Sequence, residues 1–167
     1  MLKNVRNFFF LILSFAALDQ ISKQYIIYKY NINTSNLNSQ LIDRINSFLD
    51  LHLIWNKGFA FGFFQNDITF VNNLYISLML ILILVLIIYA FKINQRTYYF
   101  CFSLIIGGAI GNLIDRFFYS AVFDFIYLHY LNYDWYVFNI ADITISLGCV
   151  LIILLELFSK KTKSKNE

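Results

Sequence analysis

Two Asn-x-x-Asp sequences stand at the ends of apolar stretches in this chain. Asn112 and Asp115 end one stretch, and Asn139 and Asp142 begin another. Residues three apart share one face of a helix, so each asparagine can hydrogen-bond its neighbouring aspartate. An ionisable side chain in a membrane span costs about 2.5 to 3.5 kcal/mol on insertion scales, so it needs a partner, a water-filled cavity or a function.

A pair of aspartates suggests the chemistry of an aspartic protease. Two carboxyl groups that converge on one water molecule cannot both ionise cheaply, so they share a proton. The ionised member takes a proton from the attacking water, and the protonated member donates to the carbonyl oxygen of the amide. We therefore expect Asp115 and Asp142 to be the catalytic pair, with no cofactor. His52 and His129 show no ligand spacing such as HExxH, which disfavours a metal centre.

Each aspartate also has a structural interpretation. Asp115 next to Arg116 fits an ion pair at the end of a span, and Asp142 fits an acidic residue in the first turn of a helix, where it favours the helix dipole. Asp19 is followed four residues later by Lys23, the favourable orientation for a helical ion pair. Structural support is therefore the expected role of Asp19.

The elements that must position these residues are membrane spans. The chain has 167 residues, of which 59% are hydrophobic and 14% charged, and its mean hydropathy is +0.62. Crossing the hydrocarbon core takes about 20 helical residues. Four segments qualify, at about 8–28, 71–91, 98–116 and 138–158, and we expect one membrane-embedded domain over 1–167. The net charge of +3 indicates no nucleic-acid partner.

Basic residues orient this four-span bundle. Eight of the 13 lysines and arginines fall before the first span, between the second and third, and after the fourth: Lys3, Arg6, Lys92, Arg96, Lys160, Lys161, Lys163 and Lys165. The positive-inside rule places both termini in the cytoplasm. Asp115 at the end of the outward third span and Asp142 at the start of the inward fourth span then lie near the outer face.

Glycines in the third span allow a close approach to its backbone. Gly107, Gly108 and Gly111 remove side chains from that helix, so another helix or a substrate can pack against it. We count Gly108 among the residues that support the site.

Taken together, the motifs resemble the lipoprotein signal peptidase (signal peptidase II) family. The resemblance rests on five boxes in the family's order: LDQISK (18–23), NKGFAFGFF (56–64), GGAIGNLIDR (107–116), VFDFI (122–126) and FNIADITI (138–145). It implies a bacterial inner-membrane aspartyl endopeptidase that cleaves diacylglyceryl-modified prolipoproteins before the lipobox cysteine. The dyad positions of the family's boxes fall on Asp115 and Asp142. Supporting positions fall on Asp19, Lys23, Asn56, Asn112, Arg116, Asp124, Asn139 and Ala141.

The outer connections suggest how such a substrate would be held. The alternation in DLHLIW (50–55) predicts a short strand of a small extracytoplasmic sheet, and Asn56 can hydrogen-bond the substrate backbone. The segment AVFDFIYLHYLNYDWY (121–136) suggests a short amphipathic helix that lies in the interface as a lid. Lipid and peptide would enter laterally, between the spans, into what we expect to be a monomer.

Two other functions remain open from the residues alone. A small proton-coupled transporter also uses intramembrane carboxylates, but it usually distributes them through the membrane depth and shows internal repeats, which this chain lacks. A non-catalytic scaffold would explain the glycines as helix packing, but it gives no reason for the paired Asn-x-x-Asp motifs.

Overall fold

Four long helices form the body of the protein. The structure, a computed structural model, describes residues 2–33, 40–58 and 68–163. The helices are α1 (Leu2–Lys29), α2 (Ile68–Ile93), α3 (Arg96–Tyr119) and α4 (Ile140–Lys163), and all four are long and apolar enough to cross a membrane. The four predicted spans are therefore confirmed, although most helix ends extend a few residues beyond the predicted limits.

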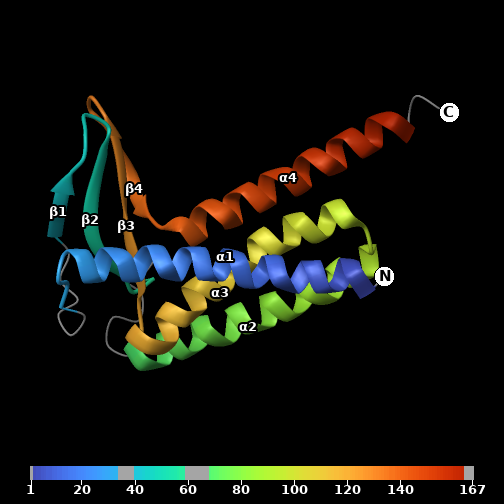
Figure 1. The fold of residues 1–167 in the computed structure, drawn as a ribbon, viewed down its shortest axis with the longest axis horizontal. Coiled ribbons are helices and arrows are strands. Elements are labelled where there is room, and N and C mark those ends of the chain that lie inside the picture. The colour runs from blue at the N-terminus through green and yellow to red at the C-terminus, as the bar shows by residue number, and fades with distance from the viewer. Residues whose placement is uncertain (1, 34–39, 59–67, 164–167) are drawn as a thin grey trace.

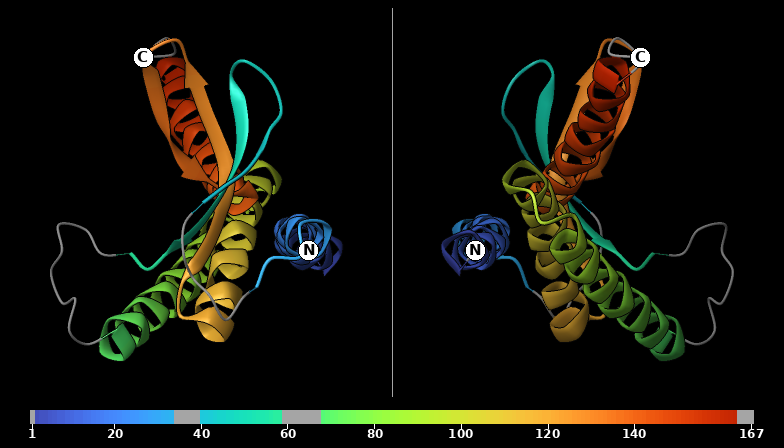
Figure 2. Two further views of the ribbon diagram at one scale, coloured as in Figure 1. Left: turned by 90° about the vertical axis from the view of Figure 1, so that its left-hand side faces the viewer. Right: turned by 90° about the vertical axis from the view of Figure 1, so that its right-hand side faces the viewer.

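Helix α3 is the centre of the bundle. It packs against α1, α2 and α4, and Figure 2 shows these three helices arranged around it. Most of α3 is buried, whereas the other three helices expose many large apolar side chains. Exposed apolar side chains on long helices are the expected surface of a protein whose solvent is lipid. A small sheet caps one end of the bundle, and both termini lie at the other (Figure 1).

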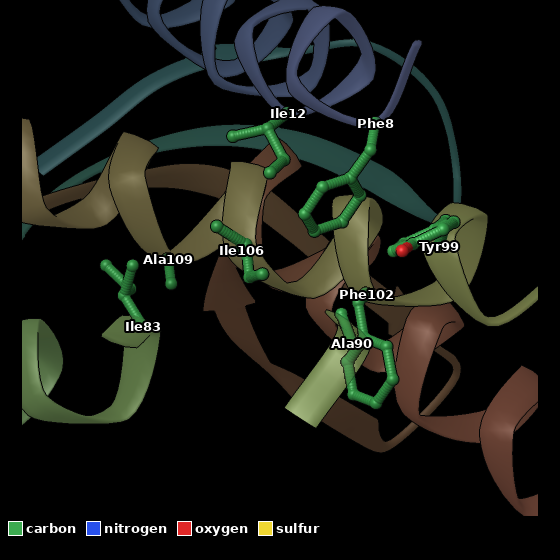
Figure 3. Packing of buried hydrophobic residues seen from close by; sticks show 8 residues of the cluster. All are labelled: Phe8, Ile12, Ile83, Ala90, Tyr99, Phe102, Ile106 and Ala109. Atoms are coloured by element: carbon green, nitrogen blue, oxygen red, sulfur yellow. The ribbon is translucent and has the colours of Figure 1, made fainter. Parts of the chain in front are cut away.

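The core at the end near the termini is built from α1, α2 and α3. Phe8 and Ile12 of α1 face Tyr99, Phe102 and Ile106 of α3 (Figure 3). The rings of Phe8 and Tyr99 lie 5.0 Å apart, a separation typical of favourable aromatic pairs. Burying aromatic side chains stabilises the bundle even in lipid, because helices there associate mainly through close packing.

The sheet has four antiparallel strands in the order β1-β2-β3-β4. Its strands are β1 (Gln40–Arg44), β2 (Leu49–Asn56), β3 (Val122–Tyr130) and β4 (Tyr133–Phe138). The predicted strand over 50–55 is confirmed as part of β2. A second apolar cluster, with Ile26 of α1 and Trp55 of β2 among its members, fastens the sheet to the helices.

The predicted interfacial helix over 121–136 is wrong. This segment forms the hairpin of β3 and β4, and the helices of the described residues are only the four that span the bundle. Residues Val122–Phe125 are buried: the first three pair with β2, and Phe123 and Phe125 pack in the second apolar cluster. Alternating apolar and polar residues suit a half-buried strand, and pairing with the distant β2 outweighs any amphipathic helical pattern.

Candidate active site

Asp115 lies inside the helix bundle, and its carboxylate is fully engaged. Its Oδ1 accepts a hydrogen bond from Gln20 at 2.8 Å. Its Oδ2 receives the backbone N–H of Phe123 at 3.0 Å and the ammonium group of Lys23 at 2.8 Å. Only 1% of the residue is exposed. Asp115 therefore joins α1, α3 and the start of β3.

Lys23 is the centre of a buried polar network between α1 and α3. It forms the ion pair with Asp19 that their spacing predicts, at 2.7 Å, and it also pairs with Asp115. Its third donor goes to Asn112 Oδ1 at 3.0 Å. All three protons of the ammonium group thus have acceptors, as a buried lysine requires.

The second Asn-x-x-Asp motif is a capping box at the start of α4. Asp142 donates its backbone N–H to Asn139 Oδ1 at 3.0 Å, and Asn139 returns its own N–H to Asp142 Oδ2 at 3.2 Å. This reciprocal pair satisfies two free N–H groups at the helix start. Asp142 Oδ1 accepts a further bond from Asn112 Nδ2 at 3.0 Å. Asn112 thus links Lys23 to Asp142, and helical capping explains the spacing of the second motif.

Another carboxylate, that of Asp124 in β3, shares Asn139 with Asp142 and also contacts Asn56. Asn139 Nδ2 donates to Asp124 Oδ1 at 2.6 Å, and Asn56 Nδ2 donates to Asp124 Oδ2 at 3.0 Å. Burial, followed by the negative charge of Asp142, raises the pKa of Asp124 to about 7. A carboxyl group with a pKa near 7 can both bind and release a proton at neutral pH.

A cavity of about 620 Å³ opens next to Asp124 and Asp142. It is lined by both aspartates, by Asn56, by residues 135–138 of β4, and by one face of α4 as far as Val150. Asp115 is not among its lining residues. The structure therefore brings Asp124 and Asp142, but not Asp115, to the lining of one cavity.

Arg116 turns away from Asp115 and toward α2. Its guanidinium group lies 4.2 Å from the centre of the Tyr75 ring, a favourable cation–π contact. Asn72 Nδ2 donates to the Arg116 carbonyl oxygen at 3.1 Å. Among the described residues, no ion pair joins Arg116 to Asp115.

Gly108 and Gly111 serve contacts between helices. A Cβ at Gly111 would lie 2.5 Å from Asp19 Oδ2, and one at Gly108 would lie 2.6 Å from the carbonyl oxygen of Ala141. Ala141 also donates its backbone N–H to Asp19 Oδ1 at 2.9 Å. The glycines thus let α1 and α4 approach α3 closely enough to assemble the polar network.

Sequence reasoning did not single out Gln20. Its amide donates to Asp115 and, at 3.0 Å, to the carbonyl oxygen of Gly111. The available signal was an uncharged polar residue directly beside Asp19 within the first span. The glycine-rich part of the second box extends past residue 58 and lies outside the described residues.

Metal ligands do not gather in the part of the chain that the structure describes. No group of three or more histidine, cysteine, aspartate or glutamate side chains there is arranged to hold an ion. The described residues instead offer the carboxyl groups of Asp124 and Asp142, oriented by asparagine side chains, beside a cavity.

Comparisons with known proteins agree with one another. The family model of Signal peptidase (SPase) II matches residues 11–158. The chain is 42% identical to the lipoprotein signal peptidase of Pelagibacter ubique (strain HTCC1062), over 98% of each chain, and 37% identical to that of Rickettsia conorii (strain ATCC VR-613 / Malish 7), over 86% of this chain and 69% of the relative. A solved bacterial membrane enzyme is also similar, with a TM-score of 0.75 and 28% identity over 95% of this chain and 92% of that one. This multi-pass membrane protein therefore belongs to the signal peptidase II family.

Proposed function

We propose that the protein is an aspartyl endopeptidase that removes the signal peptide from diacylglyceryl-modified prolipoproteins, cutting before the lipidated lipobox cysteine. The observation that carries the proposal is the cavity that Asp124 and Asp142 both line, because an amide bound there would lie beside both residues. Membership of a family of peptidases makes transport a poor alternative.

The geometry favours Asp124, rather than Asp115, as the catalytic partner of Asp142. Asp115 has one ion pair and two further hydrogen bonds, and it does not border the cavity. A catalytic acid or base must reach the proton that it transfers, directly or through one water molecule. We assign Asp115 to the support of the site, together with Asp19 and Lys23.

In this mechanism the two carboxyl groups have different roles. Asp124, whose pKa is raised to about 7, is the proton donor, and Asp142 is the proton acceptor. Asp142 accepts a proton from the attacking water while Asp124 donates to the carbonyl oxygen, and the roles then exchange as the amide nitrogen leaves. Asn139, which contacts both aspartates, fixes their relative orientation.

The cavity also suits a substrate that is part peptide and part lipid. Its lining includes β4, whose Trp135 and Tyr136 are exposed, and the part of α4 that carries the apolar residues Ile143, Leu147 and Val150. Tryptophan and tyrosine favour the boundary between water and lipid. We propose that the site lies near the extracytoplasmic face of the inner membrane, that both termini are cytoplasmic, and that the enzyme acts as a monomer.

The direct test is cleavage of a purified prolipoprotein by the detergent-solubilised protein. The substrate is supplied with and without the diacylglyceryl group, with a chelator present, and Asp142→Asn serves as the inactive control. Cleavage of the lipidated form alone, unaffected by chelation and absent in the variant, is the expected result. Well-folded wild-type protein that cleaves neither substrate would refute the proposal.

A further inference from the structure

One hydroxyl group in α4, that of Ser146, differs from the other described serine and threonine hydroxyl groups that lie beyond the first turn of a helix. Side chains of five serine and threonine residues donate to a backbone carbonyl oxygen three or four residues earlier: Ser14, Ser22, Ser77, Ser103 and Thr144. Such bonds are the usual way for a helix in lipid to satisfy a hydroxyl group. Ser146 makes no such bond among the described residues, although the helix offers it the same carbonyl acceptors.

Ser146 lines the cavity that contains the two aspartates. It follows Asp142 by four residues, so it lies on the same face of α4 and about 6 Å further along the helix axis. Leu147 and Val150 continue the cavity wall in the same direction, away from the sheet. The exposed hydroxyl group of Ser146 therefore makes no hydrogen bond within the described residues, and beyond Asp142 it is the one polar side chain that α4 contributes to the lining.

The order of chemical groups along the cavity matches a lipid-modified cysteine. From the sheet inward the cavity offers carboxyl groups, then one hydroxyl group, then aliphatic side chains. A diacylglyceryl cysteine presents its scissile amide, then ester carbonyls a few bonds away, then acyl chains. Ester carbonyl oxygens accept hydrogen bonds, and a donor in a low-dielectric site gains most from such a partner.

We infer that Ser146 Oγ donates a hydrogen bond to an ester carbonyl oxygen of the substrate's diacylglyceryl group. This bond positions the modified cysteine beside Asp124 and Asp142, and it makes Ser146 a specificity residue rather than a catalytic one. The inference rests on the proposed function, because it requires a lipidated substrate in this cavity.

The test compares ester and ether lipids. A prolipoprotein carrying a dialkylglyceryl group keeps the chain length but lacks the carbonyl oxygens. With the wild-type protein, kcat/KM for the ester substrate should exceed that for the ether substrate by about fivefold, the worth of one hydrogen bond. Ser146→Ala should reduce this ratio to near one, and Ser146→Thr, which keeps the hydroxyl group, should restore it.

Ser77→Ala is the matched control. Ser77 lies in α2, its hydroxyl group is bonded to Asn73, and it does not line the cavity, so the variant should keep the wild-type ratio. An unchanged ratio in Ser146→Ala, or a wild-type ratio near one, overturns the inference while cleavage itself upholds the proposed function. Wild-type protein that cleaves neither lipid form refutes the proposed function and this inference with it.

Discussion

Replacing each of the three aspartates by asparagine separates catalysis from structural support. Asp115→Asn removes the charge that pairs with Lys23 inside the bundle. Loss of one partner of a buried ion pair costs about 3 to 5 kcal/mol, and the lower value applies because Lys23 keeps its contact with Asp19. For a chain of this length, about 3 kcal/mol lowers Tm by roughly 6 to 12 °C.

Asp124→Asn should have a small effect on stability and a large effect on activity. The substitution weakens one hydrogen bond, either to Asn56 or to Asn139, which costs about 1 kcal/mol and therefore roughly 2 to 4 °C in Tm. It also removes the group that we assign as the proton donor, so kcat should fall by at least about 100-fold. Asp142→Asn should lose activity to a similar extent.

The assay measures both properties on the same samples. Thermal unfolding in detergent gives Tm, and cleavage of lipidated prolipoprotein, corrected for the folded fraction, gives kcat. The reasoning fails if folded Asp124→Asn cleaves at the wild-type rate while Asp115→Asn, with an unchanged Tm, cleaves nothing. Asp115 would then be the partner of Asp142.

Three further outcomes follow from the same contacts. Gly111→Ala should lower Tm and activity together, because its Cβ would meet the Asp19 carboxylate; a variant with wild-type Tm would contradict the close packing. Lys23→Met should lower the folded yield, measured by size-exclusion chromatography, since it leaves Asp115 and Asp19 buried without their cation. Asp124 binds its proton up to about pH 7 when folded but only to about pH 4 when unfolded, so its stabilising contribution is lost as the pH rises through that window. The fall in Tm from pH 5 to pH 8 should be smaller in Asp124→Asn than in the wild type, and wild-type kcat should decline above about pH 7. Equal changes of Tm with pH in the two proteins would contradict a titration of Asp124 in this range.

The sequence predicted the helices well because each is a long apolar run. A span of about 20 residues is set by the thickness of the bilayer, which needs no knowledge of neighbouring elements. The hairpin over 122–138 was harder, because its alternation of residues suits an interfacial segment as well as a strand. The partner that decides between them, β2, lies about 70 residues earlier in the chain.

The pair that we propose, Asp124 and Asp142, differs from the pair that the sequence predicts, Asp115 and Asp142, for a physical reason. Spacing places Asp115 and Asp142 at a similar depth, but depth does not fix the direction in which a helix presents a side chain. The rotation of α3 is set by its contact with α1 at Gly111, and it directs Asp115 to Lys23 instead of the cavity. Asp124 was identified only as a supporting position, since its place beside Asp142 depends on the register of β3 in the sheet.

The position of Lys23 has a consequence for how the chain is assembled during synthesis. Helix α1 is made first, and its Asp19–Lys23 pair lies within one helix, so α1 can enter lipid with its charges already neutralised. Asp115 comes later, on α3, and the only ion-pair partner that the structure gives it among the described residues is Lys23 on α1. The carboxylate of Asp115 therefore gains its cation only when α3 packs against α1, so the contact between these two helices is what compensates a charge buried in α3.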